Sequence, residues 1–203
     1  MNNDPNNHPL PGNMLGTIYK GGVIVPVIQT LLLTVLVLSI ERAFAIGKAK
    51  GKGNVVKFVK NVKDALNGGD VEKARELCVK QKGSVASVVY SALTKYEEME
   101  KDTTLAKDQK LMNIQKELDE ATALELPTLE QNLVVIATMT TLGTLTGLLG
   151  TVIGMIKSFA ALANAGSPDS VALSAGISEA LVNTAFGIAT GALAVISYNY
   201  FTS

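Results

Sequence analysis

The longest apolar segment of this chain runs from Leu133 to Ala163, and Lys157 is its only charged residue. As one helix it would be roughly 46 Å long, more than the ~30 Å hydrocarbon core of a bilayer. It must therefore tilt or project beyond the membrane. Small and hydroxylated residues recur along it at steps of four and three, which places them on one helix face: Thr140, Thr144, Gly147, Thr151, Gly154 and Ser158. This pattern predicts a face that packs against other helices or lines a polar passage.

The segment from Ile177 to about Phe201 is a second apolar helix with an unusual polar pattern. Its spacing of four places one set of residues on one face: Glu179, Asn183, Gly187 and Gly191. A carboxyl group inside a membrane is costly and commonly marks an ion or proton path. Glu179 has an alternative reading, because Lys157 lies near the outer end of the adjoining helix. If these two residues pair, the pairing holds Glu179 ionised and favours a structural role.

A third apolar helix comes earlier in the chain, from Val23 to Ile40, and ends at Glu41-Arg42. Six lysines follow it before the next acidic residue: Lys48, Lys50, Lys52, Lys57, Lys60 and Lys63. Positive charge next to a span indicates the cytoplasmic side, and lysines there contact lipid headgroups. The N-terminus is then external. It lacks the basic start of a cleaved signal, so we interpret it as a retained arm.

The predicted organisation is an all-α, three-span membrane protein with a helical cytoplasmic domain. Its segments are an external arm (1–22), a first transmembrane helix (23–47), the cytoplasmic domain (48–130), a second transmembrane helix (131–163), an external loop (164–176) and a third transmembrane helix (177–203). The absence of a basic cluster after the third helix favours a chain that continues beyond Ser203.

Four helices are predicted in the cytoplasmic domain. The first is a stripe from Val55 to Leu66 that ends at Asn67-Gly-Gly, and Asp70 can cap the second. The third opens at Ser84, and the fourth begins near Thr103 or Thr104. The fourth helix can run on into the second span, with a kink at Pro127.

Composition agrees with a membrane protein that has a large aqueous part. The 203 residues are 47% hydrophobic, with a mean hydropathy of +0.28, and most charged residues lie between Lys48 and Glu130. One cysteine and one histidine cannot form an intrachain disulfide or a usual zinc site. The chain also lacks a usual nucleotide-binding glycine loop and a nucleophile elbow. We expect no enzymatic activity, no cofactor, no metal and no nucleic-acid partner.

Three motifs resemble the MotA/TolQ/ExbB proton-channel family, and most closely its ExbB type. They are Glu41-Arg42, Gly147-Leu-Leu-Gly-Thr-Val-Ile-Gly-Met, and Ile177-Ser-Glu-Ala-Leu-Val-Asn-Thr-Ala-Phe-Gly with Ala194-Val-Ile-Ser-Tyr-Asn199. The chain departs from the family pattern at Thr144 and Leu193, where members often have proline.

The resemblance implies a pentamer in the bacterial inner membrane, with a pore lined by the second and third spans. Within the pore would lie the single spans of an ExbD- or TolR-like partner that carries an aspartate. Proton flow would drive motion that passes to a TonB- or TolA-like protein. By motif position, the pore residues would be Thr151, Thr184 and Glu179. Outer-membrane transport of the TonB type, envelope maintenance of the TolQ type and surface motility all remain open.

The same residues also allow plainer readings. Thr151 and Thr184 can bond back to the carbonyl four residues earlier, and Thr144, Gly147, Gly154, Ser158, Asn183, Gly187 and Gly191 can serve helix packing alone. A different class of function is therefore an alternative, namely a helical membrane scaffold or a cation channel that works without a partner.

Overall fold

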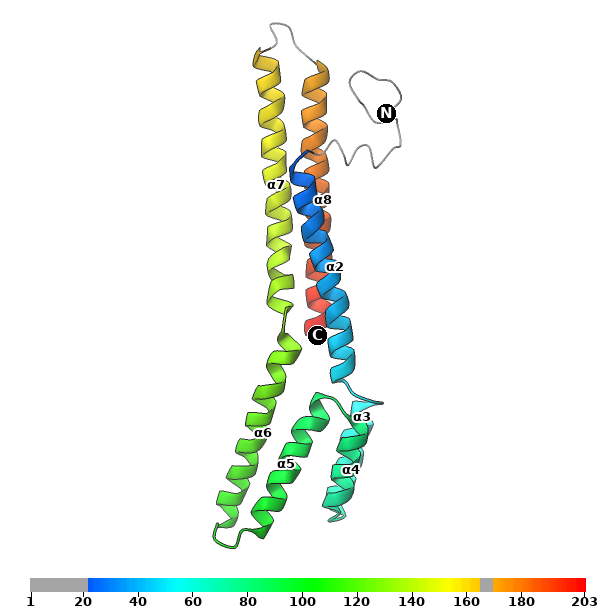
Figure 1. Ribbon diagram of the computed structural model, residues 1–203, viewed down its shortest axis with the longest axis vertical. Helices are drawn as coiled ribbons and strands as arrows, with labels where there is room; N and C mark the ends of the chain where they lie inside the picture. Colours follow the sequence, from blue (N-terminus) through cyan, green and yellow to red (C-terminus); the bar gives the residue numbers. More distant parts are fainter. Residues whose placement is uncertain (1–21, 165–169) are drawn as a thin grey trace. The chain divides into compact units, whose positions relative to one another are not determined.

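The computed structural model describes residues 22–164 and 170–203, and every regular element in these ranges is an α-helix (Figure 1). The all-α prediction is confirmed. The helices are α2 (Ile24–Ala49), α3 (Val55–Asn67), α4 (Val71–Gln81), α5 (Ser84–Lys101), α6 (Lys107–Glu130), α7 (Leu133–Asn164) and α8 (Ser170–Thr202). The predicted N-terminal arm up to residue 21, and residues 165–169 of the predicted external loop, lie outside the described residues.

Three helical stretches of the described chain are long and apolar enough to cross a membrane, as predicted. They lie in α2, in the stretch that ends with α7, and in α8. The last of these helices begins at Ser170 and not at Ile177, so the end of the predicted loop is helical. The helix therefore includes the small and apolar residues before Ile177. Among them is Gly176, which packs closely on α7.

The boundary between α6 and α7 is a short turn at Gln131 and Asn132, and not a kink at Pro127. Pro127 lies inside α6, whereas Asn132 has a φ of 63°. Asparagine tolerates this left-handed conformation better than most residues. The carbonyl of Asn132 then accepts from the Ile136 amide at 3.1 Å, which starts α7.

The chain divides into two compact units. The first, which we call the transmembrane unit, holds the described residues up to Ile40 together with α7 and α8. The second, the loop unit, spans Glu41–Gln131.

The transmembrane unit is organised around a very close contact between α7 and α8. A Cβ atom added to Gly147 would lie 2.8 Å from the Cα of Gly187, and one added to Gly154 would lie 2.9 Å from the Gly176 carbonyl oxygen. The glycines in this contact form what we call the glycine seam: Gly143, Gly147, Gly150 and Gly154 of α7 with Gly176, Gly187 and Gly191 of α8. Small residues let helix backbones approach closely inside a membrane, where van der Waals packing drives association.

The first span packs against the same pair of helices through larger side chains. Val35 of α2 is fully buried in a cluster with Ile136 of α7 and Ala194 of α8. Many other apolar side chains of these helices remain exposed, as lipid or neighbouring helices require.

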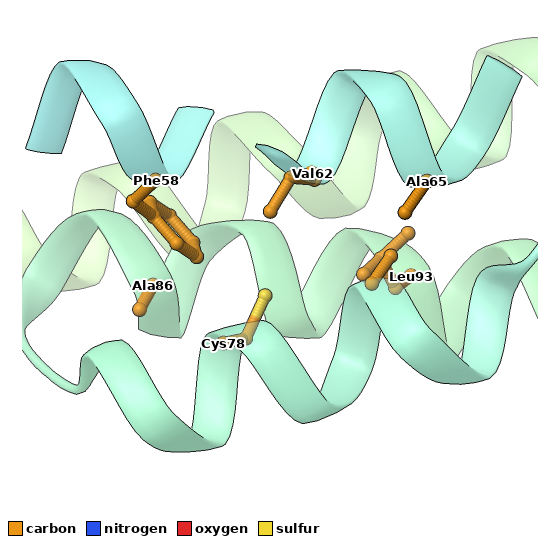
Figure 2. Packing of buried hydrophobic residues seen from close by; sticks show 7 residues of the cluster. Phe58, Val62, Ala65, Cys78, Ala86 and Leu93 are labelled. Carbon is orange, nitrogen blue, oxygen red and sulfur yellow. The ribbon is translucent and has the colours of Figure 1, made fainter. Parts of the chain in front are cut away.

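The loop unit has an apolar core of its own (Figure 2). Phe58, Val62 and Ala65 of α3 face Cys78 of α4, with Ala86 and Leu93 supplied by α5. The Asp70 carboxylate caps α4 by accepting from the Lys73 amide at 2.9 Å, as predicted. Burial raises the pKa of the Cys78 thiol, which suits a small core residue more than a reactive one.

Arg42 secures the C-terminal end of α6 within the loop unit. Its guanidinium is buried, donates to the Glu41 carboxylate at 2.7 Å, and donates to the Thr128 carbonyl at 3.2 Å. The last four carbonyls of a helix have no partner within the helix. The predicted motif at the end of the first span therefore provides a cap for another helix.

The glycine seam leads to a first prediction. Gly147→Ala places a methyl group against the α8 backbone, which cannot rotate away, so α7 and α8 must separate. We expect a loss of about 1–3 kcal/mol of stability, measured by denaturation of the purified protein in detergent. Gly47→Ala in α2 is the matched control, because nothing lies within 4 Å of its added Cβ. Equal losses in the two variants would contradict the packing role.

Candidate functional site

Thr151 and Thr184 meet between α7 and α8, and their hydroxyl groups are hydrogen-bonded to each other. The Thr151 oxygen also lies 3.2 Å from the Gly147 carbonyl oxygen and 3.4 Å from that of Ala180. Both side chains are half-buried. A hydroxyl can donate and accept at once, so the two threonines form a short hydrogen-bonded chain across the contact. The bond to Gly147 is the back-bond that packing alone predicts, whereas the bond between the hydroxyls links two helices.

Glu179 lies about 7.5 Å along the α8 axis from Thr184 and is paired with Lys157 of α7. Its carboxylate oxygen is 2.7 Å from the Lys157 ammonium nitrogen. The Glu179 side chain is 14% exposed and that of Lys157 is 51% exposed. Gly22, before α2, also contacts this carboxylate, because a Cβ added there would lie 2.0 Å from its oxygen. The pairing considered from the sequence is present, and it favours the structural alternative for Glu179.

Asn183 lies one turn beyond Glu179 and is fully buried. Its side chain packs against Gly150, where an added Cβ would be 2.6 Å from the Asn183 Cβ. Neither polar atom of the amide has a hydrogen-bond partner among the described residues. The amide therefore contributes packing within this chain and leaves its hydrogen-bonding groups unused there.

The remaining residues of the predicted stripes separate into two groups. Most lie buried in the α7–α8 contact: Gly147, Gly154, Ser158, Gly187 and Gly191. Ser158 donates to the Gly154 carbonyl at 3.0 Å. Thr144 is exposed beside the seam and donates to the Thr140 carbonyl at 3.0 Å. The predicted face thus lines the contact with α8 in its middle and reaches the surface at Thr144.

Four contributors to the α7–α8 contact were not among the predicted site residues. Gly143, Gly150 and Gly176 complete the seam, and Thr190 is fully buried beside Gly143. The overlapping Gly-x-x-x-Gly pairs of α7 carried a signal for Gly143 and Gly150. No pattern in the sequence indicated that Gly22 would approach Glu179, since that contact joins distant segments.

The site offers hydrogen-bond exchange and one ion pair. The described residues contain no group of three His, Cys, Asp or Glu side chains that could hold a metal ion. Beyond residue 132 the charged residues of the sequence are Lys157, Asp169 and Glu179. Lys157 and Glu179 form an ion pair with each other, and the Thr151–Thr184 hydroxyl bond is an uncharged polar contact between α7 and α8.

Comparison with known proteins agrees with these features. A family model described as the MotA/TolQ/ExbB proton channel family matches residues 81–203. An ExbB-like biopolymer transport protein of Synechocystis sp. is 35% identical over 88 residues, which cover 42% of this chain and 42% of that protein. The Tol-Pal system protein TolQ of Pseudomonas aeruginosa is 26% identical over 189 residues, which cover 87% of this chain and 79% of that protein.

The Lys157–Glu179 pair allows a test by a double-mutant cycle. Lys157→Gln leaves the largely buried Glu179 without its partner, and Glu179→Gln leaves the half-exposed Lys157 without its partner, whereas the double variant removes both charges. We expect a coupling energy of about 1 kcal/mol, limited by the exposure of Lys157, from denaturation in detergent. The exposed Lys116–Glu120 pair of α6, 3.6 Å apart, is the control, with an expected coupling below about 0.5 kcal/mol. Additive effects at 157 and 179 would refute the predicted coupling.

Proposed function

The chain belongs to the MotA/TolQ/ExbB proton channel family, and on this basis we propose that it is a subunit of a motor driven by the proton-motive force. Families of this kind move protons and are not a known enzyme class, so the proposed role involves no covalent chemistry on a substrate. The proposed motor is a pentameric ring around the transmembrane helices of a partner.

The observation that carries this proposal is the hydroxyl pair of Thr151 and Thr184. It places two groups that donate and accept hydrogen bonds where α7 and α8 meet. A hydroxyl pair can exchange hydrogen bonds with water or with a passing carboxyl group. A helix pair held by packing alone requires only the glycines of the seam.

The charges of the transmembrane unit support the need for a partner. Glu179 is engaged with Lys157, so a second carboxyl group is required as a proton carrier. A single-span partner of the ExbD or TolR type, with an aspartate at membrane depth, would supply it. Thr151 and Thr184 would then contact that carboxyl group, and Glu179 would set cation preference near one end of the path.

The proposed location is the bacterial inner membrane, with the N-terminus periplasmic and the loop unit cytoplasmic. This orientation rests on the lysines that follow the first apolar segment. Within the family, we propose the ExbB role, in which the motor energises TonB-type transport across the outer membrane. The match to a TolQ protein keeps a stator for envelope maintenance or motility, working through a TolA-like protein, as the second candidate.

The hydroxyl pair should be needed for proton flow and not for assembly. We expect Thr151→Val/Thr184→Val to reduce proton flux into proteoliposomes holding the protein and its partner by at least about tenfold, since valine keeps the shape and removes the hydrogen bond. Glu179→Gln tests whether Glu179 acts in the path in addition to pairing with Lys157: we expect reduced flux with assembly intact, and wild-type flux in this variant would assign Glu179 the structural role. Thr138→Val is the control, because Thr138 is an exposed residue of α7 that bonds back to Val134 at 2.8 Å. Wild-type flux in the double valine variant would refute the proposed path.

Native mass spectrometry in detergent tests the assembly, with the chain alone and co-expressed with a single-span, aspartate-bearing partner. We expect a pentamer that takes up two partner chains. A monomer or dimer that does not bind the partner would support the alternative of a helical membrane scaffold. A ring that conducts protons equally well without a partner would support a stand-alone cation channel.

A further inference from the structure

A small basic pocket lies in the loop unit where the chain leaves α2 and enters α3. It has a volume of about 250 Å³. Its walls come from the turn after α2, the first turns of α3 and the end of α4: Lys52, Gly53, Asn54, Lys57, Phe58, Asn61, Leu77, Lys80 and Gln81. Phe58 also belongs to the apolar core of the unit (Figure 2), so one residue both lines the pocket and packs in that core.

The turn that carries Lys52 is held in place by backbone contacts. The Lys52 amide donates to the Gln81 carbonyl at 2.6 Å, and the Gln81 side chain donates to the Lys50 carbonyl at 3.3 Å. Gly51, with a φ of 72°, lies so close to α4 that an added Cβ would be 2.0 Å from the Lys82 carbonyl oxygen. The backbone of the turn is therefore built against the end of α4, and Lys52 and Lys80 line the same pocket.

The pocket has an excess of positive charge. Three of its lining residues are lysines and none is acidic. Lys80 has an exposed partner in Glu76 at 3.6 Å, whereas the structure gives Lys52 and Lys57 no ion pair within the described chain. Asn61 adds a carboxamide that can donate hydrogen bonds. Such a concavity attracts an anion with several acceptor oxygens, as a phosphate has.

The length of α2 places this pocket close to the lipid headgroups. A helix of 26 residues is about 39 Å long, compared with ~30 Å for the hydrocarbon core and ~40–45 Å for the bilayer with its headgroups. If the apolar part of α2, up to Ile40, crosses the hydrocarbon core, Ala49 lies about 14 Å beyond that core, at the outer surface of the headgroup layer. Lys52 follows Ala49 by three residues and so lies within about 11 Å of the end of α2.

We propose that this pocket binds the phosphate group of an anionic phospholipid, with Lys52, Lys57 and Lys80 as its ligands. A lipid is favoured over a soluble phosphate compound because the pocket is tied to the end of a membrane span. The apolar floor at Phe58 and Leu77 suits the glycerol part of a headgroup. Binding there fixes the start of α3 to the membrane surface, in addition to the general attraction of basic residues to anionic lipid. This inference rests on the membrane location of α2 and is independent of the proposed proton path.

The test uses the full-length protein in detergent with equal amounts of phosphatidylglycerol and phosphatidylcholine, and counts bound lipids by native mass spectrometry. We expect the wild-type protein to retain phosphatidylglycerol selectively. In Lys52→Gln/Lys57→Gln, the amount of bound phosphatidylglycerol should fall by at least about tenfold. The matched control is Lys60→Gln/Lys63→Gln, which removes the same charge from the same basic run outside the pocket, and should retain most of the binding. Lys52→Arg/Lys57→Arg keeps the charge and should retain selectivity, which separates loss of binding from misfolding.

Three results would overturn the proposal. An equal loss in the two Lys→Gln double variants would mean that the basic run attracts anionic lipid without a defined pocket. Unchanged binding in all variants would place the lipid elsewhere. Displacement of phosphatidylglycerol by an equal concentration of inorganic phosphate, at constant ionic strength, would show that the pocket is a site for soluble anions.

Discussion

The close approach of α7 and α8 is the constraint on which the transmembrane unit depends. A Cβ added to most of the seam glycines would lie 3.0 Å or less from atoms of the opposite helix, so any larger residue there would separate the two backbones. Only at this separation can the short side chains of Thr151 and Thr184 reach each other. The polar contact is therefore a consequence of the glycine packing, and the two features cannot be changed independently.

Helical periodicity identified the correct face of α7, but it could not show what covers that face. The stripe from Thr140 to Ser158 was expected to pack or to line a passage, and it does the first over most of its length while Thr144 reaches the surface. Spacing gives the direction of a side chain on its own helix. The depth of the contact depends on residues of α8, such as Gly187 and Gly191, and on the register between the helices, which no local pattern encodes.

Local signals predicted the loop unit more closely than the ends of the spans. Asp70 caps α4 as its position suggested, because capping depends on residues within one turn. The break between α6 and α7 falls at Asn132, although Pro127 was the stronger local signal. A left-handed asparagine at position 132 interrupts the helical backbone, whereas Pro127 is accommodated within α6. The approach of Gly22 to Glu179 was beyond sequence reasoning, since it joins residues far apart in the chain.

The two units differ in how their charged residues are arranged. In the transmembrane unit Lys157 and Glu179 neutralise each other, which limits the cost of placing charge near a low-dielectric region and leaves uncharged hydroxyls at the contact of α7 with α8. A path built from hydroxyls alone passes hydrogen bonds but does not store a proton, because the pKa of an alcohol is far from neutral pH. Storage requires a carboxyl group from outside this pair. The loop unit, in contrast, has a pocket lined by three lysines and no acidic residue, which we propose to bind lipid phosphate and which takes no part in the proposed proton path. The proton path proposed above therefore depends on a carboxyl group that the hydroxyls of Thr151 and Thr184 can contact but cannot replace.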